Sequence, residues 1–222
     1  MSWESPQQRG WTDGGAADAW FERNKTRLSP TLPPTKIQKL FASRIRPGQR
    51  VLEIGTANGF QLRILREQVQ CEAYGIDPSP VAIADGKVRY PELNLSVGTA
   101  DKLEFPDQNF DVVIFGACLC LVDRTSLMRA VAEADRVLRP EGHLIIADFD
   151  PTVPHRRRFK HQEGLWTYKM HYADLWLANP CYALAEKVSF SHEGDGFHAD
   201  PNERMAAWVL VKCMEHAYVE LP

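Results

Sequence analysis

The stretch Val51-Leu52-Glu53-Ile54-Gly55-Thr56-Ala57-Asn58-Gly59 decides the fold of this chain. It joins a short apolar strand to an acid and to a turn of small residues that leads into a helical segment. Small residues in such a turn allow a ligand to approach the backbone closely. Glu53 would lie near that turn, where its carboxylate either holds a positively charged or amine-bearing ligand or caps the turn. The stretch therefore predicts a strand followed by a ligand-binding turn.

A second acid lies at the spacing that a nucleoside site requires. Asp77 follows Gly55 by 22 residues and ends the strand-like segment 72–77. Doubly wound sheets place an acid at this point to accept hydrogen bonds from both ribose hydroxyls. Alternatively, Asp77 only caps the helix that is expected from Pro80 onward. The spacing favours a nucleoside ligand.

Strand-like and helix-like segments alternate outward from this stretch. Strands are expected at 51–55, 72–77, 93–100, 110–122 and 143–149, and helices at 36–44, 59–68, 80–89 and 124–138. This alternation predicts a parallel sheet with helices on both faces. The last two apolar segments, 181–191 and 204–214, predict an antiparallel pair that closes the sheet. We therefore expect a doubly wound α/β fold with seven strands, mostly parallel, with an antiparallel C-terminal strand.

Composition sets limits on the class of protein. The chain has 222 residues, of which 44% are hydrophobic and 25% charged, so we expect one domain over 1–222. A net charge of -3 gives no basic field for nucleic acid or anionic membranes, and neither is an expected partner. No apolar run of about 20 residues and no signal-peptide pattern is visible, so we expect a cytoplasmic protein. The five scattered cysteines indicate reduced thiols, and no metal site is expected. The sequence predicts no oligomeric state.

The pattern acid-x-Gly-x-Gly-x-Gly is matched by Glu53, Gly55 and Gly59, with Ala57 in place of the middle glycine. Through these residues, the segment 98–101 and the segments that follow it to about residue 150, the chain resembles the class I S-adenosylmethionine-dependent methyltransferases. The resemblance implies a Rossmann-like methyltransferase fold, S-adenosylmethionine as cofactor, S-adenosylhomocysteine as product, and Asp101 as acceptor for the adenine amino group. The expected cofactor-binding residues are Arg23, Glu53, Gly55, Thr56, Ala57, Gly59, Asp77, Pro78, Ala100, Asp101, Lys102 and Gly116.

Two other functions fit parts of the pattern. A nicotinamide-dependent oxidoreductase would need glycines at 55, 57 and 60, but the chain has Gly55, Ala57 and Phe60. A non-catalytic binding module on the same fold is the other alternative, and Ala57 is its only support.

The acceptor side is expected in a cap at 151–180, with a helix over 165–178. Methyl transfer is an in-line displacement that depends on positioning, and some oxygen acceptors also need a base. The candidate catalytic residues are His171, Tyr168 and Asp148, with His171 preferred as base because it titrates near neutrality. His171 is equally compatible with a structural role. Tyr168 and Tyr172 would share a helical face, where they either pack in the core or line the acceptor site.

Basic and aromatic residues complete the expected acceptor site. Arg156 and Arg157 either clamp a carboxylate or phosphate or lie in a solvated loop. An N-terminal arm, 1–35, is expected to carry one short helix at 16–25. It would fold over the cofactor as a lid, with Arg23 at the cofactor carboxylate, or its helix would only be pinned against the domain by Trp20 and Phe21. The expected substrate-binding residues are Trp20, Arg156, Arg157, Lys169 and Tyr172. The sequence thus predicts a tailoring methyltransferase that acts on an oxygen or nitrogen of a small molecule or peptide, with a carboxylate oxygen among the candidates.

Overall fold

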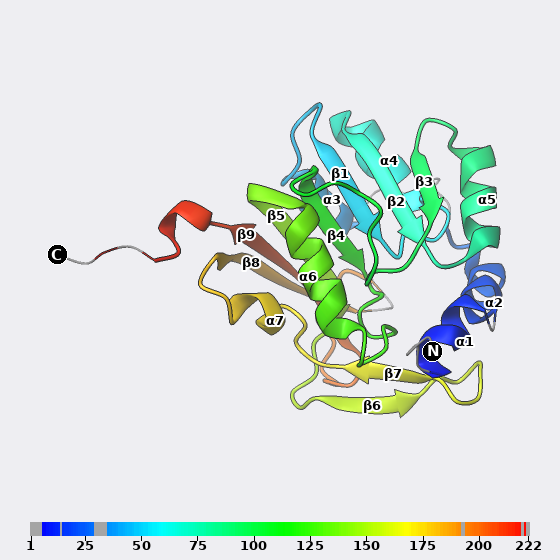
Figure 1. Ribbon diagram of the computed structural model, residues 1–222. Helices are drawn as coiled ribbons and strands as arrows, with labels where there is room; N and C mark the ends of the chain where they lie inside the picture. Colours follow the sequence, from blue (N-terminus) through cyan, green and yellow to red (C-terminus); the bar gives the residue numbers. More distant parts are fainter. Residues whose placement is uncertain (1–5, 14, 29–34, 192–193, 219, 221–222) are drawn as a thin grey trace, which may run out of the picture.

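The computed structural model describes residues 6–13, 15–28, 35–191, 194–218 and 220. Its centre is a seven-stranded sheet in the order β3-β2-β1-β4-β5-β9-β8 (Figure 1). The strands are β1 (Arg50–Ile54), β2 (Glu72–Asp77), β3 (Asn94–Val97), β4 (Phe110–Gly116), β5 (Leu138–Phe149), β8 (Tyr182–Ser191) and β9 (Arg204–Lys212).

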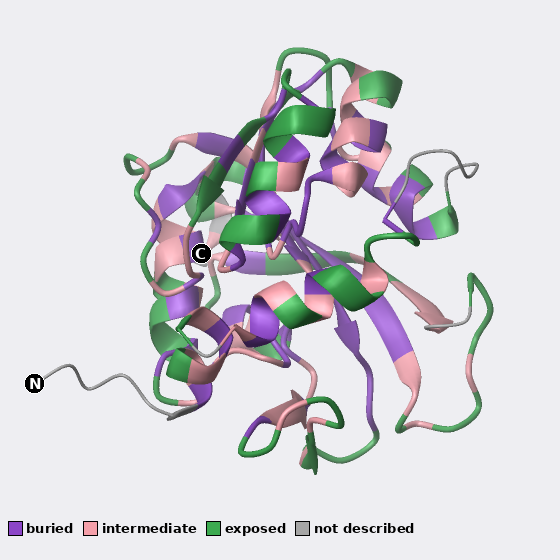
Figure 2. Cartoon of the chain, turned by 90° about the vertical axis from the view of Figure 1, so that its right-hand side faces the viewer, coloured by how far each residue is buried: buried purple, intermediate pink, exposed green. Residues whose placement is uncertain are grey.

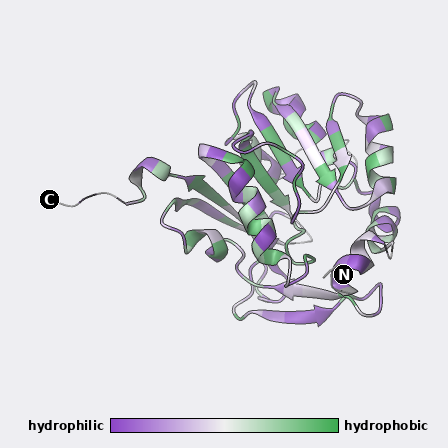
Figure 3. Cartoon of the chain, viewed as in Figure 1, coloured by the Kyte–Doolittle hydropathy of each residue, from purple (hydrophilic) through white to green (hydrophobic). Residues whose placement is uncertain are grey.

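The sheet is parallel from β1 to β5, and β9 runs antiparallel to both β5 and β8. The predicted fold class is therefore confirmed. Buried parallel strands read as continuous apolar runs because both faces are covered, and β1 and β4 show this pattern. Figure 3 shows hydrophobic colouring along the central strands.

Helices cover both faces of the sheet. One face packs against α3 (Lys36–Ala42), α4 (Phe60–Val69) and α5 (Pro80–Arg89), and the other against α6 (Leu127–Val137) and α7 (Asp174–Leu177). The central strands are largely buried between these two layers (Figure 2). Within the described ranges, no helix is long and apolar enough to cross a membrane.

Helix starts follow the local sequence. Thr35 and Gln38 form a capping box at α3, and the Ser79 hydroxyl caps α5 ahead of Pro80. Gly59 precedes α4 with a left-handed φ of 83°. Ala57 also has a left-handed φ, 52°, which is strained for a residue with a Cβ. The alanine that replaces the middle glycine of the pattern therefore still takes a left-handed conformation like that of Gly59.

The arm contains two helices, α1 (Pro6–Thr12) and α2 (Ala16–Asn24), of which only α2 was expected. The Gln7 side chain is buried and bonds to the backbone of Leu121 and Trp166. The Asp18 carboxylate accepts a hydrogen bond from the Ser79 hydroxyl at 2.5 Å, which ties α2 to the start of α5. Residues 1–5 and 29–34 of the expected arm lie outside the described residues.

The prediction of a helix over 165–178 is wrong. That segment forms β7 (Trp166–Lys169), which pairs with β6 (His155–Arg158), and then the short helix α7. Long-range pairing replaces the local helical bonds, since Tyr168 N donates to Cys120 O. Tyr168 and Tyr172 therefore do not share a helical face. The strand expected over 110–122 ends at Gly116, because Ala117 turns to a left-handed φ of 55°.

Candidate functional site

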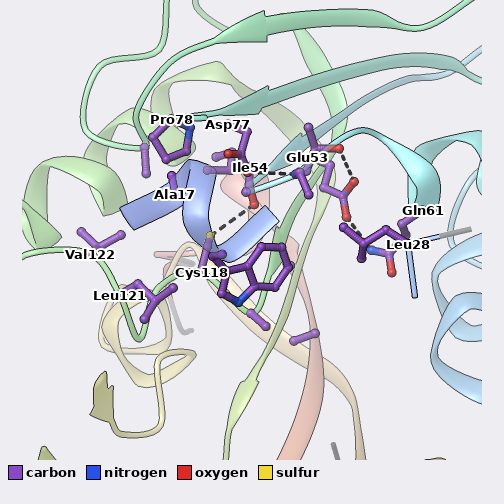
Figure 4. Close-up of a pocket in the computed structure, with 18 of the residues that line it drawn as sticks. Ala17, Leu28, Glu53, Ile54, Gln61, Asp77, Pro78, Cys118, Leu121 and Val122 are labelled. Atoms are coloured by element: carbon purple, nitrogen blue, oxygen red, sulfur yellow. Dashed lines mark hydrogen bonds between the residues drawn. The ribbon is translucent and has the colours of Figure 1, made fainter. Parts of the chain in front are cut away.

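A cavity of about 560 Å³ opens at the carboxyl ends of the strands. The order of strands reverses between β1 and β4, and ligands of open α/β sheets bind at such a switch point. Residues from β1, β2, β4, α1 and α2 line the cavity, and its volume lies in the range of small-ligand sites. Figure 4 shows Glu53, Asp77 and Cys118 around this space, with Leu28, Leu121 and Val122 at its sides.

Glu53 lies on β1 at the floor of the cavity. The Thr56 hydroxyl and the Gln61 amide each donate to its carboxylate at 2.6 Å (Figure 4). The side chain is almost fully buried, and this burial raises the pKa of Glu53 to about 7 against the opposing effect of both hydrogen bonds. The negative charge of Asp77 adds to the increase. A cationic ligand would compensate the cost of ionising this group.

Asp77 ends β2 and holds the turn after β1. Its carboxylate accepts hydrogen bonds from Ala57 N and Ser79 N, both at 2.9 Å. Burial raises the pKa of Asp77 to about 6, although these two hydrogen bonds favour the ionised form. Each carboxylate oxygen accepts one backbone N–H and keeps a second lone pair. Asp77 can therefore order the turn and also accept from a hydroxyl-bearing ligand.

Asp101 follows β3 and lines the cavity together with Glu53 and Asp77. The Gln8 amide nitrogen lies 3.2 and 3.3 Å from its two carboxylate oxygens, and Arg129 lies 3.4 Å away. The side-chain oxygen of Gln8, Oε1, accepts a hydrogen bond from the Ser126 hydroxyl at 2.5 Å. Helix α1 is therefore attached directly to this acidic end of the cavity.

Close packing fixes the turn at the centre of the cavity. Gly55 has a φ of 78°, and a Cβ there would lie 2.6 Å from Cys118 Cβ. The Cys118 thiol donates to Ile54 O at 3.2 Å, and burial raises the pKa of that thiol well above its usual value. A Cβ at Gly116 would lie 3.1 Å from a Glu53 oxygen. A side chain at position 55 would therefore overlap Cys118, and one at position 116 would crowd the Glu53 carboxylate.

The structure brings most of the predicted cofactor residues together. The expected cofactor-site and substrate-site residues that line the cavity are Trp20, Glu53, Gly55, Thr56, Ala57, Asp77, Pro78, Ala100, Asp101 and Gly116. Three expected cofactor residues do not line it. Arg23 is exposed on α2, Lys102 is 80% exposed beside Glu104, and Gly59 serves as the N-cap of α4.

The three candidate catalytic residues do not line the cavity. Asp148 is fully buried and accepts from Cys120 N and Phe149 N, and burial raises its pKa to about 6. His171 Nε2 lies 2.9 Å from an Asp150 oxygen, next to the Trp208 ring. The Tyr168 ring lies under the guanidinium of Arg124. Their catalytic roles stay predictions.

The basic and aromatic residues of the expected acceptor site also lie elsewhere. Arg156 covers the Trp166 ring at 4.2 Å, and Arg157 pairs with Glu203 at 2.7 Å. The Lys169 ammonium is buried over the Phe149 ring and bonds to Asn202 O.

Tyr172 is also fully buried. Its hydroxyl donates to Tyr168 O at 2.7 Å and accepts from Arg124. Burial raises the pKa of this hydroxyl. None of the four side chains Arg156, Arg157, Lys169 and Tyr172 contributes to the lining of the cavity.

Sequence reasoning missed several residues of the site. Gln61 bonds to Glu53, and Gln8 bonds to Asp101 from the arm. A polar residue in the first turn of α4 is a weak local signal that could have found Gln61. No local signal could have found Gln8, because 93 residues separate it from Asp101.

The sheet order and the acid-lined cavity define a Rossmann-like α/β protein with a ligand site at its switch point. Residues 52–146 match the family model described as a methyltransferase domain. The demethylmenaquinone methyltransferase of Beutenbergia cavernae is 34% identical over 104 residues, which cover 47% of this chain and 42% of that protein. A ubiquinone/menaquinone biosynthesis C-methyltransferase of Bordetella avium is 35% identical over 115 residues, covering 48% of this chain and 43% of that protein.

A solved structure supports the fold over more of the chain. The 1,6-didemethyltoxoflavin-N1-methyltransferase of Burkholderia thailandensis, with bound S-adenosylhomocysteine, superposes with a TM-score of 0.67 at 15% identity. The superposition covers 90% of this chain and 86% of that chain. Residues 52–146 therefore match a methyltransferase domain, and the fold agrees with the resemblance that the sequence pattern indicated. The matched segments span less than half the length of the two sequence relatives.

Proposed function

We propose that this protein binds S-adenosylmethionine in the cavity and transfers its methyl group to a small-molecule acceptor. One observation carries the proposal. Three acids, near the end of β1, at the end of β2 and after β3, line a single cavity at the switch point. These are Glu53, Asp77 and Asp101. An acid at the end of each of three neighbouring strands suits a cationic ligand that also carries hydroxyl and amino donors.

The residues present fit this cofactor. Asp77 would accept from the ribose hydroxyls, because its oxygens keep lone pairs beyond those used by Ala57 N and Ser79 N. Asp101 would accept from the adenine amino group, and the backbone at Gly55 and Gly116 would face the amino-acid end. Bound S-adenosylmethionine supplies an electrophilic methyl group on a sulfonium ion.

The contribution of the protein to the reaction is position and exclusion of water. Helices α1 and α2 line the cavity through Gln8, Trp11, Ala17 and Trp20. Since Gln7 and Asp18 fasten these helices to the domain, the arm would act as a lid over the bound ligands. The expected cap at 151–180 would support the arm, because Leu165 packs with Trp11 and Ala17.

The relatives bear on the acceptor. Two of them are named for demethylmenaquinone and for ubiquinone or menaquinone biosynthesis, and the second is a C-methyltransferase. These names support a small ring compound as the acceptor. They also make carbon a candidate for the methylated atom, besides the oxygen and nitrogen expected from the sequence. A nicotinamide-dependent oxidoreductase is less well supported, because Ala57 and Phe60 replace glycines that its phosphate-binding loop needs.

Isothermal titration with S-adenosylhomocysteine tests the proposal. We expect micromolar binding to the wild-type protein and a loss of at least about tenfold, or ~1.4 kcal/mol, in Asp77→Asn. Asp174→Asn changes an acid outside the cavity that is 69% exposed, and serves as the matched control. Absence of binding to the wild-type protein, or binding of NAD(H) in its place, would reject the methyltransferase function.

A further inference from the structure

The cavity has a second region that the cofactor residues do not explain. Its lining comes from α3, α4, β5, β8 and β9, elements that do not carry the three acids at the ends of β1 to β3. The apolar side chains of this region are Ile37, Phe41, Ile64, Ala147, Phe190 and Met205, and Gln38 and Gln61 line the cavity from the same helices α3 and α4. Five of the six apolar side chains are buried, and Phe190 is half-buried near the end of β8. Large apolar side chains that face a cavity favour an apolar occupant, because its binding removes their surface from water.

The charges that line the whole cavity have one dominant sign. Among the described residues, its acidic side chains are Glu53, Asp77, Asp101, Asp123 and Asp195, and its basic side chain is Arg27. Asp195 accepts from Lys36 N at 2.8 Å, which holds this acid beside the start of α3 and the apolar region. A cleft lined mainly by acids has a negative potential, which attracts cations and repels anions. The same potential that favours a sulfonium cofactor therefore opposes an anionic acceptor.

The arginines expected to clamp an anion lie away from this region, and the one arginine in the described lining, Arg27, follows α2 and belongs to none of the elements of this region. Arg156 is stacked on Trp166 and Arg157 is paired with Glu203, and neither lines the cavity. Lys, His and Tyr are absent from the lining within the described part of the chain. An acceptor here must therefore lose its proton to a carboxylate such as Glu53 or to water near neutral pH.

We infer that the methyl acceptor is an uncharged, largely apolar ring compound that occupies the region formed by α3, α4, β5, β8 and β9, and that anionic acceptors are excluded. This inference rests on the proposed function, since it assumes that the acidic half of the cavity holds the cofactor. It departs from the acidic acceptor that Arg156 and Arg157 suggested in the sequence. The nucleophile loses its proton to a carboxylate or to water as the new methyl bond forms, and the sulfur keeps the electron pair of the broken bond.

Two probes with the same ring system and different charge test the inference. The protein is first saturated with S-adenosylhomocysteine, and its affinity for 2-naphthol and for 2-naphthoate is then measured by titration at pH 7.5. We expect 2-naphthol to bind at least tenfold more tightly than 2-naphthoate. Phe190→Ala should weaken 2-naphthol binding at least fivefold and leave S-adenosylhomocysteine binding unchanged, because Phe190 lines the apolar region.

Phe197→Ala is the matched control, since this phenylalanine is 66% exposed and does not line the cavity. Equal or tighter binding of 2-naphthoate, absence of 2-naphthol binding to the loaded protein, or an unchanged 2-naphthol affinity in Phe190→Ala would each overturn the inference. If S-adenosylhomocysteine itself fails to bind, the proposed function fails first. The two failures are therefore distinguishable.

Discussion

Replacing Glu53 with glutamine should make the unliganded protein less sensitive to pH. Burial raises the pKa of Glu53 from 4.5 to about 7, so its ionised form is less stable in the folded protein than in the unfolded chain. The stability that this group contributes is complete below pH 4.5 and is lost as pH rises through 7. A shift of this size corresponds to about 3.4 kcal/mol in full, of which about 2.5 kcal/mol falls between pH 5 and pH 8.

Thermal unfolding of the wild-type protein and Glu53→Gln, followed by circular dichroism without cofactor, measures this effect. The free energy of unfolding of the variant relative to wild type should rise by about 2.5 kcal/mol from pH 5 to pH 8, or about 5–10 °C in Tm. Other buried acids such as Asp77 and Asp148 are present in both proteins, so their titration largely cancels. Glu104→Gln is the control, because that side chain is 83% exposed. A difference between variant and wild type that stays constant over this pH range would refute the reasoning.

Two further substitutions test the packing around the cavity. Gly55→Ala and Gly48→Ala both place a Cβ at a φ of 78°, but only the first would bring it within 2.6 Å of Cys118 Cβ. We expect Gly48→Ala to lower the free energy of unfolding by about 1–2 kcal/mol from backbone strain alone, and Gly55→Ala by about 2 kcal/mol more. Urea unfolding measures both, and equal losses would contradict the close contact. Gln7→Ala should lower the free energy of unfolding by about 1–3 kcal/mol and increase hydrogen exchange in α1, because it leaves buried backbone groups without their side-chain partner. Unchanged protection of α1 would contradict the role of Gln7 as the anchor of the arm.

The sheet could be predicted because its signals are local. Each strand is a short apolar run, and each of the helices α4, α5 and α6 is preceded by a small or polar N-cap residue. The spacing from Gly55 to Asp77 encodes one strand-helix-strand unit, so both residues meet at one end of the sheet. Ala57 was a visible departure from the glycine pattern, and the structure accommodates it in the same left-handed turn.

The cap could not be predicted in the same way. The segment from Leu165 onward is rich in aromatic and aliphatic residues that suit either a helix or a strand. Its conformation depends on pairing with His155–Arg158 and on the bond from Tyr168 N to Cys120 O. Because the segment is a strand, Lys169 and Tyr172 point into packed surroundings rather than along one helical face.

The sequence by itself therefore determined the α/β sheet, the turn after β1 and the acids of the cofactor half, since each depends on residues within one strand-helix-strand unit. Only the tertiary structure decided what closes the cavity and what faces its apolar half. Gln7 reaches Trp166 across 159 residues and Gln8 reaches Asp101 across 93, while α3, β8 and β9 come to the cavity from segments far apart in the chain. Such contacts leave no periodic or spacing signal, because they depend on where whole elements pack and not on the order of neighbouring residues.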